Sequence, residues 1–180
     1  GLFADDIDEI ISGFEALFND KDQPVWETKE ALHGDERRVI IPGFIEQSPQ
    51  LAPLQHDPRV VGIVQSLVGR DYTWASSDGN LFYCESYWHP DTYSAPLGQY
   101  HIKLSFYLDD LNAESGAIRL IPGSQFHNQT FARTLNRNFH DATKISEFFG
   151  VAGGEIPSVT MENTPGDLII WNFRTIHGSY

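Results

Sequence analysis

Apolar residues recur at helical spacing in two segments near the start of the chain. The first follows Asp5 and Asp6, either of which can cap a helix, and contains Ile7, Ile10, Ile11, Phe14, Leu17 and Phe18. In the second, Asp57 is the expected cap, Pro58 takes the first helical position and Gly69 ends the helix. Both patterns predict amphipathic helices with one face packed against the rest of the protein.

From about Tyr72 the pattern changes to short runs of aromatic and β-branched residues, separated by Gly, Pro, Asn and Asp, as is typical of strands. The clearest run is Gln99–Leu108, where polar and apolar residues alternate and one face carries His101, Lys103, Ser105 and Tyr107. Further strands are predicted at Ala117–Ile121 and Leu168–Phe173. The second half of the chain is therefore expected to be mainly β.

The segment from Phe126 to Asn163 interrupts these strands with a long polar stretch that contains one short helical pattern, at Thr143–Phe149. So long an excursion within a compact domain is usually functional, and we expect a lid over a site. The expected organisation is a single domain, with helical support in residues 1–70, a β barrel in residues 72–180 and the lid inserted at residues 126–163.

Length and charge limit the choice of function. A chain of 180 residues fits one domain with a real core, and its 41% apolar residues are interrupted too often for a membrane span. The net charge of -13 repels phosphate backbones, so nucleic acid is disfavoured as a partner, and a phosphate-bearing acyl-CoA is mildly disfavoured for the same reason.

The lone Cys84 forms no internal disulfide and no apolar leader opens the chain, which predicts a reducing, cytoplasmic location. Residue 1 is Gly, and the only Met is Met161. We therefore expect the sequence to lack its natural start, and we expect the same of its natural end.

Candidate chemistry lies in His89-Pro90-Asp91, read together with His177 far downstream. Residues two apart on a strand point to the same side, so His89 and Asp91 can converge on one ion, with His177 supplied by another strand. Two imidazoles and one carboxylate suit ferrous iron and leave coordination positions open. A chance combination among seven histidines would give the same spacing, so the triad alone leaves both readings open.

The other histidines carry less information. His33, His56, His127 and His140 have no comparable partner spacing and are expected to be surface or hydrogen-bonded residues. His101 lies on the polar strand face, which is expected to look into the same cavity as the His-x-Asp pair. It can serve as a group that supports a ligand or as a satisfied core histidine.

Several motifs around the triad occur in a specific order: Trp88-His89-Pro90-Asp91, Ser105-Phe106-Tyr107-Leu108-Asp109-Asp110, the stretch Ser115–Ser124, Gly166-Asp167-Leu168 and His177-Gly178-Ser179. Together they resemble the phytanoyl-CoA dioxygenase family of Fe(II)- and 2-oxoglutarate-dependent oxygenases. The resemblance runs from about Gln50 to the end of the chain. It implies a double-stranded β-helix, also called a jelly-roll or cupin-like barrel, with flanking α-helices.

The resemblance also implies roles for single residues. His89, Asp91 and His177 match the iron ligands, and the carboxylate of Asp91 favours oxygenation over halogenation. Ser179 matches a hydroxyl that holds the far carboxylate of 2-oxoglutarate. The Arg that normally completes this clamp is expected beyond Tyr180, and the substitutes within the chain are Lys103, Arg174 and Arg119.

The reaction implied by the resemblance uses Fe(II), 2-oxoglutarate and O2 to hydroxylate or otherwise oxidise a C–H bond of a small metabolite, with release of succinate and carbon dioxide. No side chain other than the metal ligands need be catalytic. Tyr87, Trp88 and Tyr93 flank the ligand pair and are candidate substrate contacts, although core packing explains them nearly as well. The sequence does not indicate an oligomeric state.

Three other readings compete. A cupin-like metalloenzyme that does not use 2-oxoglutarate would share the barrel and the triad, but the Pro-Gly-Ser and Gly-Asp motifs argue against it. A non-catalytic metal- or ligand-binding protein is favoured only by the missing Arg. Nucleic-acid demethylases of the same superfamily are disfavoured by the acidic charge.

Overall fold

The structure is a computed structural model of the chain. It describes residues 1–180 except 21, 23, 25, 29–37, 83–85, 94–99, 127, 139–140, 152–154 and 180, and except the side chains of residues 26–28, 142 and 148. The predictions for Cys84, His33, His127 and His140 therefore lie outside the described residues. No helix in the described ranges is both long and apolar enough to cross a bilayer.

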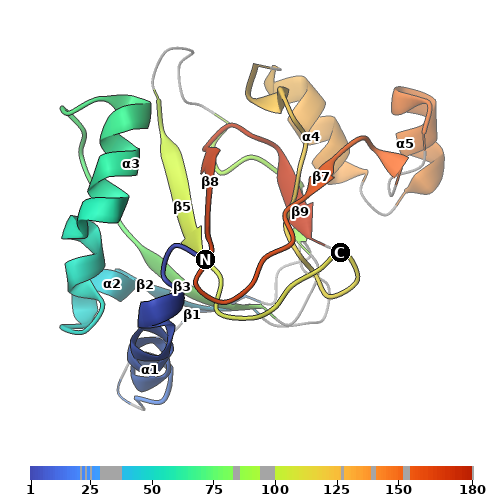
Figure 1. The fold of residues 1–180 in the computed structure, drawn as a ribbon. Coiled ribbons are helices and arrows are strands. Elements are labelled where there is room, and N and C mark those ends of the chain that lie inside the picture. Colours follow the sequence, from blue (N-terminus) through green and yellow to red (C-terminus); the bar gives the residue numbers. More distant parts are fainter. Residues whose placement is uncertain are drawn as a thin grey trace. The chain divides into compact units, whose positions relative to one another are not determined.

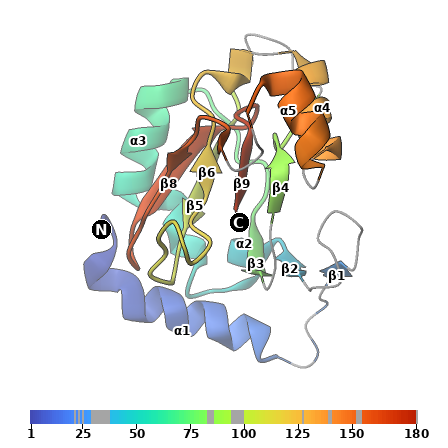
Figure 2. The same cartoon turned by 90° about the vertical axis from the view of Figure 1, so that its right-hand side faces the viewer.

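The chain divides into two compact units. One contains Gly1–Cys84 and Pro165–Leu168, and the other contains Glu85–Thr164 and Ile169–Tyr180. Figure 1 and Figure 2 show the helices and strands, and between them they label the α-helices and β-strands named below. All of the motif residues that contribute candidate metal ligands belong to the second unit.

The helices of the first unit are η1 (Ala4–Asp6), α1 (Ile7–Phe18), α2 (Phe44–Gln47), η2 (Ala52–His56) and α3 (Pro58–Val68). Of these, α1 and α3 were predicted; Asp6 stands at the N-cap of α1, but its side chain makes no capping hydrogen bond there. The side chain of Asp57 accepts a hydrogen bond from the Arg59 backbone N–H, and Gly69 follows α3 with a φ of 91°. The cap, the Pro and the Gly stop predicted for this helix are thus confirmed.

The first unit also contains an antiparallel sheet that the sequence did not reveal. Its strands are β1 (Trp26–Thr28), β2 (Arg38–Pro42) and β3 (Asp78–Phe82), in the order β1-β2-β3. Gly79 on β3 lies against the ring of Phe44, where an added Cβ would be 2.2 Å from Cδ2. The glycine is therefore required for the close packing of α2 on the sheet.

The second unit holds two smaller sheets. The first, in the order β4-β9-β6-β7, contains β4 (Ser86–His89), β9 (His177–Ser179), β6 (Arg119–Leu120) and β7 (Val159–Thr160). The second pairs β5 (Ile102–Phe106) with β8 (Leu168–Asn172). These elements confirm the predicted strands, with shorter bounds, and give a mixed α and β architecture with antiparallel pairing.

The pairing of β4 with β9 contains a register shift just before His89. Ser86 pairs with Ser179 and His89 pairs with His177, so two residues of β4 lie opposite Gly178 alone. A Cβ on Gly178 would lie 2.7 Å from the Ser86 carbonyl oxygen, so only glycine allows this approach. The His-Gly-Ser motif thus has a structural role as well as a chemical one.

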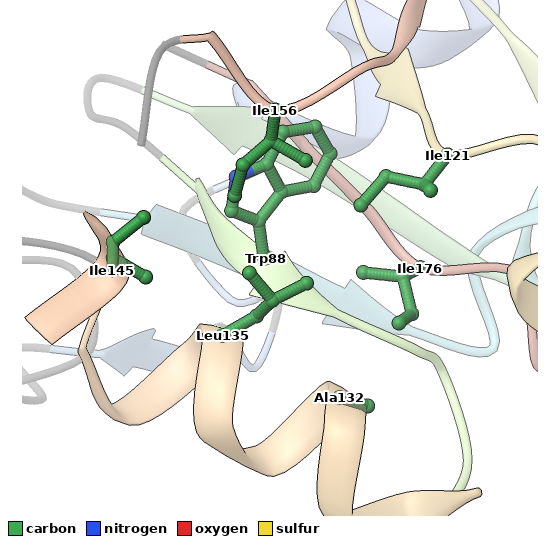
Figure 3. Packing of buried hydrophobic residues seen from close by; sticks show 7 residues of the cluster. All are labelled: Trp88, Ile121, Ala132, Leu135, Ile145, Ile156 and Ile176. Carbon is green, nitrogen blue, oxygen red and sulfur yellow. The ribbon is translucent and has the colours of Figure 1, made fainter. Parts of the chain in front are cut away.

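Two hydrophobic clusters pack the second unit. The Trp88 cluster contains Trp88, Ile121, Ala132, Leu135, Ile145, Ile156 and Ile176, and Figure 3 shows these side chains converging on the indole of Trp88. The Trp171 cluster contains Ile118, Ile169 and Trp171, with Tyr107, Leu120 and Met161 against them. Each cluster draws on strands that also carry candidate site residues.

The segment predicted as a lid is partly helical. It contains η3 (Ser124–Phe126), α4 (Gln129–Arg137) and α5 (Ala142–Phe149), of which only α5 was predicted. Figure 2 shows α4 and α5 together beside β4. Leu135 of α4 and Ile145 of α5 are fully buried in the Trp88 cluster, so this part of the segment is packed into the core.

Candidate functional site: a two-histidine, one-carboxylate centre

His89 and His177 lie side by side on neighbouring strands. They are Cα partners across β4 and β9, and their ring centroids are 4.5 Å apart. His177 is buried, with 5% of its surface exposed, and His89 is partly buried. Strand pairing therefore brings together two imidazoles that are far apart in the sequence.

Both imidazoles are oriented by a backbone carbonyl of their own chain segment. Nδ1 of His89 lies 2.6 Å from the Tyr87 carbonyl oxygen, and Nδ1 of His177 lies 2.9 Å from that of Thr175. A carbonyl only accepts, so each Nδ1 must donate its hydrogen, and each neutral ring then keeps a lone pair on Nε2. This is the tautomer in which histidine binds a metal through Nε2.

The charge state of His177 agrees with that role. Burial, together with the neighbouring His89, lowers the pKa of His177 to about 4. Its ring is therefore neutral at pH 7, and its Nε2 needs to lose no proton before it can bind a cation.

Asp91 lies next to this pair of rings. Its Oδ1 is 3.9 Å from His177 Nε2 and accepts a hydrogen bond from Lys103 Nζ at 3.0 Å, while its Oδ2 accepts one from Trp171 Nε1 at 2.9 Å. Burial opposes ionisation, but the Lys103 charge and these hydrogen bonds outweigh it and hold the pKa of Asp91 below its ordinary value. Asp91 is therefore an anion near neutral pH.

The donor set fits a divalent metal in kind. Two Nε2 lone pairs and one carboxylate oxygen are grouped within one unit, and the Lys103 ammonium already acts as the cation at Asp91. Within the described part of the chain, no three His, Cys, Asp or Glu side chains are arranged as a finished metal cage. A metal at this position would have to displace the Lys103 ammonium from Asp91 Oδ1.

A match to a protein-family model identifies the family of this chain. A sequence model described as Phytanoyl-CoA dioxygenase (PhyH) matches residues 2–180. The chain belongs to the phytanoyl-CoA dioxygenase family. Membership confirms the resemblance, and phytanoyl-CoA dioxygenases are enzymes of the Fe(II)- and 2-oxoglutarate-dependent oxygenase type.

Solved structures share the fold at low sequence identity. EvdMO1 is 20% identical with a TM-score of 0.67, and the match covers 99% of this chain and 41% of EvdMO1. HygX from Streptomyces hygroscopicus, with nickel and 2-oxoglutarate bound, is 18% identical with a TM-score of 0.67, covering 96% of this chain and 72% of HygX. The epimerase SnoN, in complex with Fe3+, alpha ketoglutarate and nogalamycin RO, is 16% identical with a TM-score of 0.65. The match covers 98% of this chain and 68% of SnoN.

The chain thus spans less than half of the length of EvdMO1 and about two thirds or more of HygX and SnoN. None of the curated proteins matches it. Because these identities are low, the likeness to solved structures concerns the fold.

Two residues at the candidate site were given no role there from the sequence. Trp171 of β8 contacts Asp91, and burial together with the charge of Asp91 raises the pKa of the Tyr107 phenol to about 12. Tyr107 could have been found, because it lies on the polar strand face that also carries Lys103. The predicted strand at Leu168–Phe173 gave no sign that its Trp would face a carboxylate.

The residues predicted to hold 2-oxoglutarate occupy different surroundings. Ser179 ends β9 opposite Ser86, and Lys103 is engaged by Asp91. Arg174 lies in the turn after β8, where its backbone N–H donates to Asn172 Oδ1. Arg119 donates from Nη2 to the Ala113 carbonyl oxygen at 3.0 Å.

The aromatic residues predicted to contact substrate are mostly used for packing in this structure. Trp88 is fully buried and Tyr87 is 9% exposed. Tyr93 packs against the Trp88 cluster, with the Arg133 guanidinium 4.3 Å from its ring centroid. His101 is exposed and lies edge-on to Phe173, with the ring centroids 6.1 Å apart.

Replacing Lys103 with methionine is expected to strengthen divalent-metal binding about tenfold, because it removes a positive charge 3.0 Å from Asp91 Oδ1. The measurement is the dissociation constant for Co(II), an air-stable substitute for Fe(II), by calorimetry. Lys144→Met is the matched control, because Lys144 forms an exposed ion pair with Asp141 at 3.3 Å. Weaker Co(II) binding in Lys103→Met would contradict the assigned competition.

Proposed function

We propose that this chain is a dioxygenase that hydroxylates or otherwise oxidises a C–H bond of a small organic molecule, with conversion of 2-oxoglutarate to succinate and carbon dioxide. The observation that carries the proposal is the grouping of His89, Asp91 and His177 within one unit, with both Nδ1 atoms turned to backbone carbonyls. We take these three residues to be the iron ligands.

In this proposal, His89 and His177 would hold iron through Nε2, and Asp91 would hold it through Oδ1. When bound, the iron supplies the site for O2 and for the keto acid end of 2-oxoglutarate. The chain's own contribution is to hold two imidazoles by their Nδ1 atoms, that of His177 being neutral, beside an ionised carboxylate. Burial of His177, together with the Trp171 cluster beside it, limits the access of water.

The far carboxylate of 2-oxoglutarate requires a cationic or hydroxyl partner. We assign Ser179 to this role from its motif, with Lys103 and Arg174 as the cationic candidates. Lys103 is the better placed of the two cations, because its ammonium already lies at Asp91 Oδ1 and would be released when a metal takes that oxygen. Its long side chain can then turn to a second carboxylate.

The substrate is proposed to be a small organic molecule. An apolar groove of about 560 Å³ lies in the second unit, and most of its wall comes from the segment predicted as a lid, including Phe131, Phe149, Val151 and Ile156. Tyr93 packs against the Trp88 cluster, to which Ile156 also belongs. An apolar groove of this volume suits a small organic molecule rather than a polymer.

We also infer that the strands belong to a double-stranded β-helix. The support is the antiparallel pairing of β4, β9, β6 and β7, with β5 and β8 as a second pair, and the likeness to the HygX and SnoN structures. In such a fold, ligands on β4 and β9 face the interior between two sheets.

The test is anaerobic addition of Fe(II) and 2-oxoglutarate to the protein. A weak visible absorption band is expected, because the keto acid chelates iron only when the three protein ligands hold the metal. Asp91→Ala provides the control and should not produce the band.

An ordinary metal content combined with no band in the wild-type chain would contradict the use of 2-oxoglutarate and favour a cupin-like metalloenzyme or a binding protein. The absence of metal binding altogether would contradict the ligand assignment itself. Once the band is seen, a metabolite panel screened for stimulated succinate release would identify the substrate class.

A further inference from the structure

Trp171 contacts two of the three proposed iron ligands. Its indole Nε1 donates to Asp91 Oδ2 at 2.9 Å, and its ring lies 5.3 Å from the His177 ring, at an angle of 54°. Only 6% of its surface is exposed. A buried tryptophan needs a partner for its single N–H, and here the partner is a carboxylate that we assign to the metal.

The two oxygens of Asp91 are held in different ways. Oδ2 is bound by Trp171, and Oδ1 is the oxygen that faces His177 Nε2 at 3.9 Å. Lys103 occupies Oδ1 with a flexible side chain that is 28% exposed. The indole is held firmly by Ile118 and Ile169 in the Trp171 cluster, so the bond to Oδ2 is the fixed one of the two.

We propose that Trp171 is a positioning residue that fixes the rotation of the Asp91 carboxylate, so that Oδ1 alone is presented to the metal. This inference rests on the proposed metal site. The indole N–H is a donor only, so it stays on Oδ2 when Lys103 leaves Oδ1. The carboxylate would then offer Oδ1 to a metal while Oδ2 stays on the indole.

The contact also links the ligands to the fold. Trp171 lies on β8, whereas Asp91 follows β4 and His177 begins β9. The same indole therefore contacts Asp91, a proposed ligand outside the regular strands, and His177, a proposed ligand within a sheet. Among the described contacts, the hydrogen bonds to Asp91 come from Trp171 and Lys103, and a metal must displace the Lys103 ion pair.

The experiment compares Co(II) binding by the wild-type chain, Trp171→Phe and Trp74→Phe. Phenylalanine keeps an aromatic ring in the Trp171 cluster but removes the N–H. Trp74 is the matched control, because its Nε1 donates to Glu46 Oε1 at 2.7 Å and Glu46 is not a proposed ligand. Trp171→Phe is expected to weaken Co(II) binding about ten- to a hundredfold, as for other groups that orient a metal ligand, and Trp74→Phe is expected to leave it unchanged.

The visible spectrum of bound Co(II) provides a readout that a purely structural role would not change. A carboxylate free to rotate can bind through both oxygens and raise the coordination number. The Co(II) absorption of Trp171→Phe is therefore expected to be weaker and shifted relative to the wild type.

A second measurement leaves Trp171 in place, in case the variant does not fold. In wild-type protein labelled with nitrogen-15, the indole N–H signal of Trp171 is expected to shift on addition of Zn(II), and in Asp91→Ala it should no longer respond. A Trp171 signal that does not shift at saturating Zn(II) would overturn the inference, as would wild-type Co(II) affinity in Trp171→Phe. If the wild-type chain binds neither Co(II) nor Zn(II), the proposed metal site itself is wrong. Failure of the proposed function is therefore distinguishable from failure of the Trp171 inference.

Discussion

Asp91→Ala is expected to abolish succinate formation, down to the level of protein kept free of metal. The substitution removes the one carboxylate of the proposed ligand set. It also leaves the Lys103 ammonium, 3.0 Å from Asp91 Oδ1 in the wild type, without that partner. A cation entering there would meet repulsion from Lys103 instead of attraction to Asp91, because an unpaired charge is incompletely screened at a partly buried position.

The measurement is succinate released from 2-oxoglutarate with saturating Fe(II), together with the metal content of each preparation. Asp110→Ala is the control, because Asp110 is an exposed carboxylate of the same unit. Thermal unfolding of both variants shows whether Asp91→Ala still folds. Turnover of a folded Asp91→Ala at the wild-type rate would show that the ligand assignment is wrong.

Trp88→Ala is expected to lower the free energy of unfolding by about 3–5 kcal/mol, the usual cost of truncating a fully buried tryptophan. Trp88 has no exposed surface and lies at the centre of a cluster that includes Leu135, Ile145 and Ile176 (Figure 3). Alanine would leave a cavity between β4 and the helices packed over it. Because Trp88 directly precedes His89, the same cavity is expected to loosen a proposed ligand.

Urea unfolding followed by circular dichroism measures this loss. Phe126→Ala removes a large apolar side chain that is 77% exposed in the same unit, and its free energy of unfolding is expected to stay within about 0.5 kcal/mol of the wild type. A Trp88→Ala protein as stable as Phe126→Ala would contradict the packing in the Trp88 cluster.

Helix α3 could be predicted closely because its signals are local. Asp57, Pro58 and Gly69 act within one turn of the helix ends, so their effect depends little on the rest of the protein. The apolar positions of α1 are equally local. The short helix α4 was missed because its segment is mostly polar, and only Ala132 and Leu135 are buried.

The sheet of the first unit was missed for the opposite reason. Strands β1 and β2 gain their stability from pairing, in which Ile40 lies opposite both Trp26 and Asn80. A short strand has no local hydrogen bonds of its own, and its partner is chosen by the folded chain. The brief apolar run of β2 is therefore ambiguous when read alone.

The candidate ligands could be named from the sequence, because the His-x-Asp spacing and the surrounding motifs are specific to a family, and a family model now matches nearly the whole chain. The polar face of β5 carries Lys103, which contacts Asp91. The assignment of 2-oxoglutarate contacts to Ser179, Lys103 and Arg174 stays a prediction.

The sequence by itself determined the family, the types of donor atoms and the helices whose caps are local. The tertiary structure decided which atoms of those donors are available. Pairing of β4 with β9 places His89 beside His177. The carbonyls of Tyr87 and Thr175 accept hydrogen bonds from the two Nδ1 atoms and so determine the tautomers. The Trp171 indole on β8 donates a hydrogen bond to one oxygen of Asp91. These relations join segments far apart in the chain, and since each depends on strand register and burial, no local pattern can encode them.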